Sequence, residues 1–322
     1  MFRFVVALVL TALTTTMAFA DAGRWQRAWP NTDFTKMSVN PFEIFSGGPP
    51  KDGIPAITGP TMKPVAAEDE IDDREPVMSV ALDGQTPRAY PIRYLMWHEI
   101  VNDRIGDVPV AVTFCPLCNS GLVFDLRMDG QELELGVSGM LRHSDMIMYD
   151  RQTESWWQQF TGEAIAGDML GKTLTPLPAL LESWAAFKSR HPDGLVMAEP
   201  TGHSRSYGSN PYRSYDTGTP FLYRGENPPH DIHPLTRVIR VDDKAWPLIR
   251  VRQAGRLEEA DLILTWTEGQ ASALDDKNIA EGREVGNVVV TSPDGTPVVF
   301  EVVFAFAFHA FTPDGEWMLG AQ

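Results

Sequence analysis

Short hydrophobic segments separated by turn residues dominate this chain and predict a mainly β fold. Asp-Gly pairs at positions 83–84, 129–130, 294–295 and 314–315 are flanked by apolar or alternating residues, which is the usual pattern of short hairpins. The pattern predicts strands at residues 77–82, 108–114, 121–127, 132–137, 288–291 and 298–311, with the third and fourth forming one hairpin.

Helical periodicity is confined to a few short segments. Residues 92–101 carry apolar side chains at helical spacing, and residues 178–190 place Leu180, Leu181, Trp184 and Phe187 along one side. His191-Pro192 is expected to end the second of these helices. The predicted fold class is therefore mainly β with a few short helices, a β-rich α+β protein.

A weak internal repeat suggests two related β modules. Residues 78–92 read as a strand, a turn and Ala-Tyr-Pro-Ile, and residues 238–248 read as a strand, a turn and Ala-Trp-Pro-Leu. Chance similarity between two hairpin starts is the alternative. Residues 201–233 are rich in Gly, Pro, Tyr, Ser and Asn without periodicity and are expected to form a long connection.

These features give an expected domain organisation. It consists of a signal peptide at residues 1–20, an N-terminal extension at 21–52, a first β-rich module at 53–200, the connection at 201–233, and a second, cysteine-free module at 234–322. Arg3, an apolar stretch at residues 4–13 and Ala18-Phe19-Ala20 are typical of a secretory leader. We expect cleavage near Ala20, a periplasmic or secreted location, and no membrane span in the mature chain, because the apolar stretch is short.

Charge and missing motifs narrow the range of partners. The 322-residue chain has a formal net charge of −16, which disfavours binding to nucleic acid. The sequence contains no glycine-rich phosphate loop, no G-x-S-x-G elbow and no H-E-x-x-H helix. We therefore expect no nucleotide cofactor, and the expected partner is a small molecule or a metal ion. The sequence leaves a protein partner and the oligomeric state open.

Cys115 and Cys118 are the two cysteines of the chain and form one Cys-Pro-Leu-Cys motif. Such a pair can bind a soft metal ion or cycle between dithiol and disulfide. A disulfide between them would close too short a loop to stabilise the fold much. The residues after Cys118 resemble a turn and a strand, whereas a glutaredoxin-like centre needs a helix there. The pattern favours a metal-binding turn between two strands, and two thiolates leave two tetrahedral positions for other ligands.

Further polar residues are candidates for the site. His98 lies on the predicted helix just before the cysteine strand and is a candidate third metal ligand; a bond to a backbone carbonyl is the alternative. Together with the thiolates it would suit copper, zinc or iron. Asp145 and Asp150 flank a short apolar strand, and Arg151 could bind an anion or pair with a carboxylate. The candidate metal ligands are Cys115, Cys118 and His98, and the candidate catalytic residues are Cys115, Cys118, Asp150 and Arg151.

Several motifs together resemble one family of exported bacterial and archaeal proteins, the domain of unknown function 3179. They are Ala89-Tyr90-Pro91, Trp97 to Asn102, the Thr113-Phe114-Cys115-Pro116-Leu117-Cys118 segment that matches its T-[FY]-C-P-L-C motif, Met148 to Thr153, and Thr161 to Gly167. The resemblance covers residues 53–200 most clearly. It implies no established activity. Members of the family usually have glycine after the second cysteine, where this chain has Asn119.

Three functions are compatible with these observations. The first is an exported metal-binding protein or metal-dependent enzyme centred on Cys115, Cys118 and His98. The second is a periplasmic thiol–disulfide oxidoreductase, in which Cys115 attacks and Cys118 resolves the mixed disulfide. The third is a non-catalytic binding module, in which the cysteines only pack in the interior.

Overall fold

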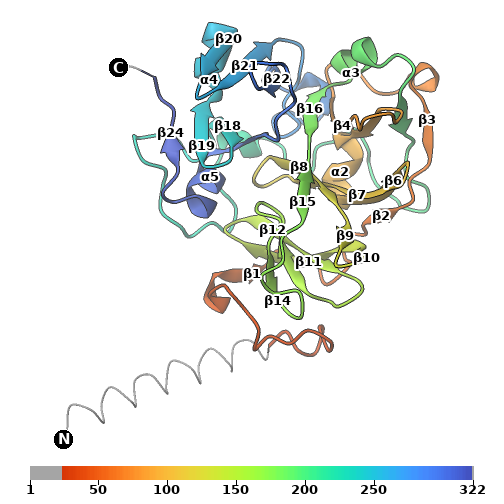
Figure 1. Ribbon diagram of the computed structural model, residues 1–322, viewed down its shortest axis with the longest axis vertical. Coiled ribbons are helices and arrows are strands. Elements are labelled where there is room, and N and C mark those ends of the chain that lie inside the picture. Colours follow the sequence, from red (N-terminus) through yellow and green to blue (C-terminus); the bar gives the residue numbers. More distant parts are fainter. Residues whose placement is uncertain (1–23, 321–322) are drawn as a thin grey trace, which may run out of the picture.

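The computed structural model describes residues 24–320 and is mainly β, as the sequence predicts. Within the described residues, several small sheets are grouped in a propeller-like arrangement together with four short α-helices (Figure 1). The predicted signal peptide at residues 1–20 lies outside the described residues. No helix within residues 24–320 is both long and apolar enough to cross a membrane.

The helices have seven residues each and the strands two to eight. The helices are α2 (Ile92–His98), α3 (Trp184–Arg190), α4 (Leu248–Ala254) and α5 (Ala305–Phe311). The strands of the first half are β1 (Ile44–Ser46), β2 (Ile57–Thr58), β3 (Met62–Pro64), β4 (Pro76–Val80), β5 (Arg88–Pro91), β6 (Ile100–Ile105), β7 (Val108–Cys115), β8 (Ser120–Asp125), β9 (Arg127–Met128), β10 (Gln131–Glu132), β11 (Leu135–Arg142), β12 (Asp145–Asp150), β13 (Trp156–Gln158), β14 (Ala164–Ala166), β15 (Thr175–Leu177), β16 (Ala179–Ser183) and β17 (Leu195–Met197). The later strands are β18 (Arg237–Val241), β19 (Lys244–Pro247), β20 (Arg256–Glu259), β21 (Leu262–Thr267), β22 (Asn287–Thr291), β23 (Glu301–Phe304) and β24 (Glu316–Trp317).

The order of elements at the start of the first half recurs in the second. The series β4, β5, α2, β6, β7, β8 corresponds to β18, β19, α4, β20, β21, β22. The sheet β16-β4-β5-β17 matches β23-β18-β19-β24, including the parallel pairing of the last two strands in each. The pattern of two related β modules, visible in sequence as Ala-aromatic-Pro-aliphatic, is therefore repeated in the topology.

The two halves differ after the equivalent strands β8 and β22. In the first half, β9 to β14 are inserted between β8 and β15, and β11 to β14 form a sheet with β1 from the N-terminal segment. This insert sheet lies below the other sheets in Figure 1. In the second half, the chain passes from β22 to β23 through a short turn at residues 292–300. The insert therefore brings a whole extra sheet against the cysteine turn of the first half.

Predicted helices were correct in place but too long. The segment predicted as a helix at residues 92–101 becomes α2 and then strand β6, because Glu99 adopts φ +59° and ends the helix. Residues 178–190 form strand β16 before α3, whose N-terminus is capped by the Ser183 side chain. Similarly, the strand predicted at 298–311 contains β23 and then α5. In each case the apolar run is too short for its periodicity to show whether it forms a strand or a helix.

The hairpin predicted around Asp129-Gly130 is smaller than expected. It joins the two-residue strands β9 and β10, with both turn residues at positive φ, as a tight hairpin turn requires. The longer flanking strands pair elsewhere: β8 pairs with β7 and β15, and β11 pairs with β1 and β12. The predicted hairpin between residues 121–127 and 132–137 therefore forms only at its turn end, because long-range pairing sets the partners of the rest of both strands.

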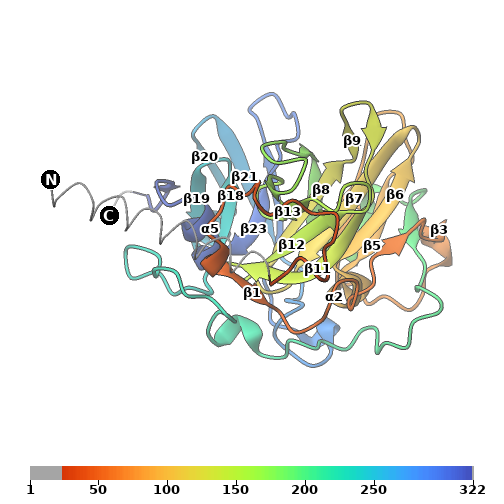
Figure 2. The same ribbon diagram turned by 90° about the horizontal axis from the view of Figure 1, so that it is seen from below.

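The connection at residues 201–233 is an extended segment that contains the short 3-10 helix Tyr215–Thr217 and no strand. It runs along one side of the molecule (Figure 2). Its Asp216 is fully buried at the side chain and accepts hydrogen bonds from Arg237 at 3.0 Å and Ser272 at 2.6 Å, and it also pairs with Arg283. These bonds fix the connection to the second half of the chain, whereas the ring of Tyr207 packs against Tyr94 and His98 of the first half.

Candidate metal centre

The cysteine motif forms the turn between β7 and β8, with Cys115 paired opposite Ser120. Asn119 lies in this turn at φ +53°, a left-handed conformation that glycine and asparagine adopt most easily. The Asn119 amide donates a hydrogen bond to the Val302 carbonyl at 2.6 Å. Asparagine therefore satisfies the same backbone requirement as the glycine usual in the family, and it also links the turn to the second half.

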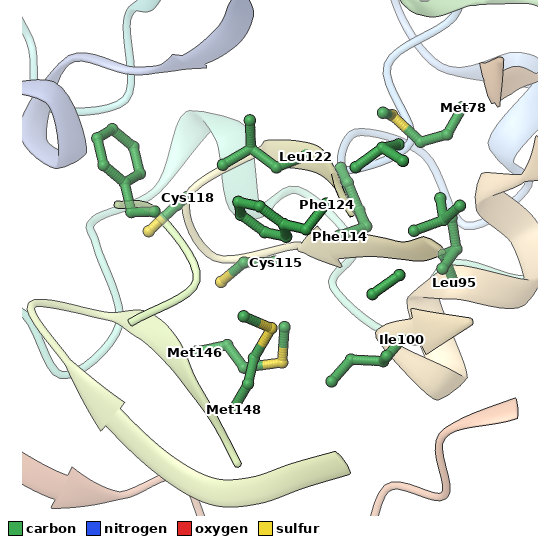
Figure 3. Close-up of a cluster of buried hydrophobic side chains, with 14 of the residues drawn as sticks. Met78, Leu95, Ile100, Phe114, Cys115, Cys118, Leu122, Phe124, Met146 and Met148 are labelled. Atoms are coloured by element: carbon green, nitrogen blue, oxygen red, sulfur yellow. The ribbon is translucent and has the colours of Figure 1, made fainter. Parts of the chain in front are cut away.

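Both cysteines are buried free thiols. Cys115 is 2% exposed, Cys118 is fully buried, and no disulfide joins them. Figure 3 shows the two side chains among buried hydrophobic residues, with Met146 and Met148 of β12 close by. The thiols therefore lie in a sheltered interior rather than on an accessible surface.

Asp145 joins the two thiols in a compact group of potential metal ligands. One carboxylate oxygen and the two sulfur atoms all lie within 4.8 Å of one another, and all three residues are buried. Tetrahedral coordination with metal–sulfur bonds of about 2.3 Å places ligand atoms about 3.8 Å apart. The group Cys115, Cys118 and Asp145 could therefore hold a metal ion after a small inward movement of its side chains.

The carboxyl group of Asp145 is only half satisfied by the protein. Its Oδ2 accepts hydrogen bonds from Gln158 Nε2 at 2.7 Å and from the Phe160 amide at 2.9 Å. Its Oδ1 is buried and has no hydrogen-bond partner within residues 24–320. A buried acceptor without a partner costs about 1–3 kcal/mol, so this oxygen has capacity for a proton or a cation.

The electrostatic environment disfavours free thiolates. Burial is the main cause that raises the pKa of Cys115 and, more strongly, that of Cys118, and the nearby Asp145 carboxyl raises both further. Burial also raises the pKa of Asp145 to about 7. A reactive cysteine needs a neighbouring positive charge or helix N-terminus to stabilise its thiolate. A bound metal ion would supply that charge and would deprotonate a coordinating thiol.

The structure does not bring His98 into this group. Its Nδ1 lies 2.7 Å from the Pro55 carbonyl oxygen and its Nε2 lies 2.7 Å from the Tyr207 hydroxyl. Both ring nitrogens are therefore already engaged. Asp145, rather than the predicted His98, lies beside the thiols, because the β11–β12 turn of the insert sheet, and not α2, reaches them.

Asp150 and Arg151 lie in separate structural networks. Asp150 accepts hydrogen bonds from Thr153 and from Trp157 Nε1 at 2.8 Å, which closes the turn after β12. Arg151 makes a bidentate ion pair with Asp52 and a further pair with Glu134. Their contacts match the alternative considered for them in the sequence, a structural role at a strand end.

A cavity of about 300 Å³ adjoins the cysteine turn at Leu117. Its walls come from the N-terminal segment, β11, β12 and the connection, and include Ile54, Leu141, Met146, Tyr212, Tyr215 and Phe221. One carboxyl group, that of Glu99, also lines it. The sequence reasoning missed this residue, although a single acid inside the run Trp97 to Val101 is a visible irregularity.

Glu99 is 8% exposed, and burial raises the pKa of its carboxyl to about 8, with a further contribution from Asp145. Unfolded glutamate has a pKa of about 4.3, so the folded chain binds this proton more tightly. The associated stability is present below the unfolded pKa and is lost as pH rises through the folded value. The metal-free protein should therefore lose stability between pH 5 and pH 8.

Glu99→Gln is expected to reduce the loss of unfolding free energy between pH 5 and pH 8 by on the order of 3 kcal/mol, since each pKa unit corresponds to about 1.4 kcal/mol. Urea unfolding of the metal-free protein at both pH values measures the effect. The pKa values of Asp145, Cys115 and Tyr212 are raised as well, and these groups are unchanged in the variant. Some pH dependence of the unfolding free energy should therefore remain. Equal losses in wild type and Glu99→Gln would contradict the prediction.

These features define a mainly β protein with a buried dithiol–carboxylate group beside a small cavity. The chain belongs to the family described as "Protein of unknown function (DUF3179)", whose model matches residues 51–315. The family resemblance noted in the sequence is thus confirmed and extends into the second half. Searches of curated proteins and of solved structures found no match.

Proposed function

We propose that this protein binds one transition metal ion through the sulfur atoms of Cys115 and Cys118 and a carboxylate oxygen of Asp145. The observation that carries the proposal is the proximity of these three buried ligand atoms, within 4.8 Å of one another. The unpartnered Oδ1 of Asp145 supports it, because a metal bond would satisfy that oxygen. Copper, zinc and iron all accept thiolate ligands and are the expected metals.

Three protein ligands leave one position of a tetrahedral site open, which is the arrangement of catalytic rather than structural zinc sites. A metal-binding protein or a metal-dependent enzyme is therefore our leading interpretation. The raised pKa values of both thiols count against the alternative of a thiol–disulfide oxidoreductase, since a small thiolate fraction slows attack on a disulfide. We further propose that the protein acts after export, in the periplasm or outside the cell.

The direct test is the metal content of the protein purified without oxygen, followed by titration of the metal-free form with copper(I), zinc and iron(II). We expect one metal ion per chain. Cobalt(II) provides a spectroscopic check, because thiolate coordination gives intense charge-transfer absorption. A metal-free protein that takes up none of these ions would end the proposal.

Asp145→Asn tests the proposed third ligand, and Asp150→Asn is its matched control. Both carboxyl groups are fully buried, and they lie at opposite ends of β12. Asp145→Asn keeps an acceptor for Gln158 and Phe160 but removes the charged ligand, so metal affinity should fall at least about 10–100-fold. Asp150→Asn should lower the unfolding free energy and leave metal affinity unchanged. Equal affinities in the two variants would exclude Asp145 as a ligand.

A further inference from the structure

The carboxyl group of Glu99 faces the cavity without a partner. Glu99 is more than nine-tenths buried, and its side chain makes no hydrogen bond or ion pair with any residue in the described part of the chain. Buried carboxyl groups are normally paired or hydrogen-bonded, because burial without compensation is costly. The group therefore has its full bonding capacity available to a molecule that enters the cavity.

The second half of the chain shows that the fold does not need a carboxyl group at this place. Glu99 ends α2 with φ +59° and ψ −31°, and Gly255 ends the corresponding helix α4 with φ +68° and ψ −44°. This backbone conformation suits glycine and strains other residues, at a cost of about 1–3 kcal/mol. In the first half the chain carries an acidic side chain in a conformation that favours glycine, directly at the wall of a cavity.

The rest of the wall indicates what the cavity would accept. Most of it is apolar, and Tyr212, Tyr215 and Phe221 of the connection supply aromatic rings. Among the described residues, no lysine, arginine or histidine lines the cavity, and the neighbouring ionisable groups, Asp145 and the two thiols, are acidic. Aromatic faces attract cations, and a wall without a cationic side chain offers no partner for an anion.

We propose that this cavity binds a small organic amine with an apolar body, whose ammonium group pairs with the Glu99 carboxylate. A volume of about 300 Å³ is at the lower end of the range for small-molecule sites, so the amine has to be compact. The apolar body contacts Leu141 and Met146, and the connection at residues 201–233 forms the outer wall through Tyr212 and Tyr215. This proposal stands without the metal, since neither thiol lines the cavity.

Benzylamine and benzyl alcohol, which are nearly the same shape, are suitable probes, and benzoate is the anionic control. Isothermal titration of the full chain, at a pH above about 8 so that Glu99 is ionised, should show benzylamine binding at least about tenfold more tightly than benzyl alcohol, with no binding of benzoate. Titrations of the metal-free and metal-loaded forms separate this result from the metal proposal. Benzyl alcohol or benzoate binding as tightly as benzylamine would overturn the assignment, as would no binding of benzylamine.

Two substitutions of Glu99 test whether its carboxyl group recognises the amine. Glu99→Gln keeps the shape of the side chain and should abolish the preference for benzylamine over benzyl alcohol. Glu99→Gly copies Gly255, so it should raise the thermal unfolding temperature while losing benzylamine binding. Both variants should take up metal as the wild type does. Retention of the tenfold preference in both variants would show that Glu99 does not recognise the amine.

Discussion

The double variant Cys115→Ser/Cys118→Ser is expected to lose metal binding almost completely. It removes two of the three proposed ligands, and serine hydroxyls are poor ligands for soft metals. The affinity should fall by more than roughly 10³-fold, or about 4 kcal/mol. Metal analysis after dialysis against a limiting concentration of the ion, with urea unfolding to confirm a folded chain, measures the change.

Met148→Leu is the matched control, because Met148 is a buried sulfur-containing residue of the same hydrophobic cluster outside the ligand group. It should bind metal as the wild type does. The double variant also separates the three functions considered from the sequence. Loss of bound metal in this variant indicates a metal protein, loss of mixed-disulfide formation indicates an oxidoreductase, and unchanged ligand binding indicates a non-catalytic binding module. Metal binding that survives loss of both thiols would place the ion elsewhere.

The largest expected loss of stability follows from Asp216→Ala. Asp216 is fully buried at its side chain and is the partner of the Arg237 guanidinium, which is itself 9% exposed. Removing the carboxylate leaves Arg237 buried without its charge partner, which costs about 3–5 kcal/mol in comparable pairs. Urea or guanidinium unfolding, with a check that the slope of the transition is unchanged, measures the loss.

Asp275→Asn is the control for this prediction. Asp275 also pairs with Arg283, at 3.2 Å, but its side chain is 28% exposed. Exposed pairs contribute about 0–1 kcal/mol, so this variant should be close to wild type. Because Asp216 fixes the connection, Asp216→Ala should also weaken benzylamine binding at the cavity wall. Similar stabilities for the two variants would show that burial of the pair is not what holds the connection.

Local sequence patterns predicted much of the fold. The turn signals Asp83-Gly84 and Asp129-Gly130 lie in hairpins, and the predicted strand at residues 108–114 is β7. The Ala-aromatic-Pro-aliphatic repeat predicted the recurring order of elements. These features depend on neighbouring residues, so a short window of sequence contains most of the information that determines them.

Strand and helix were confused where one runs directly into the other. Strands β16 and β23 are each continued by a seven-residue helix without an intervening loop. Apolar residues are spread across both parts of such a segment, so neither period stands out. The partners of these strands are distant in sequence, for example β18 for β23, and those pairings decided the local conformation.

The sequence by itself determined the family, the mainly β class and the pair of thiols in a turn between two strands. Only the tertiary structure decided that Asp145 rather than His98 joins the thiols, and that Glu99 faces a cavity closed by the connection. The physical reason is distance along the chain. Asp145 comes from an inserted sheet about 30 residues away and part of the cavity wall from about 100 residues away, and no local pattern encodes such contacts.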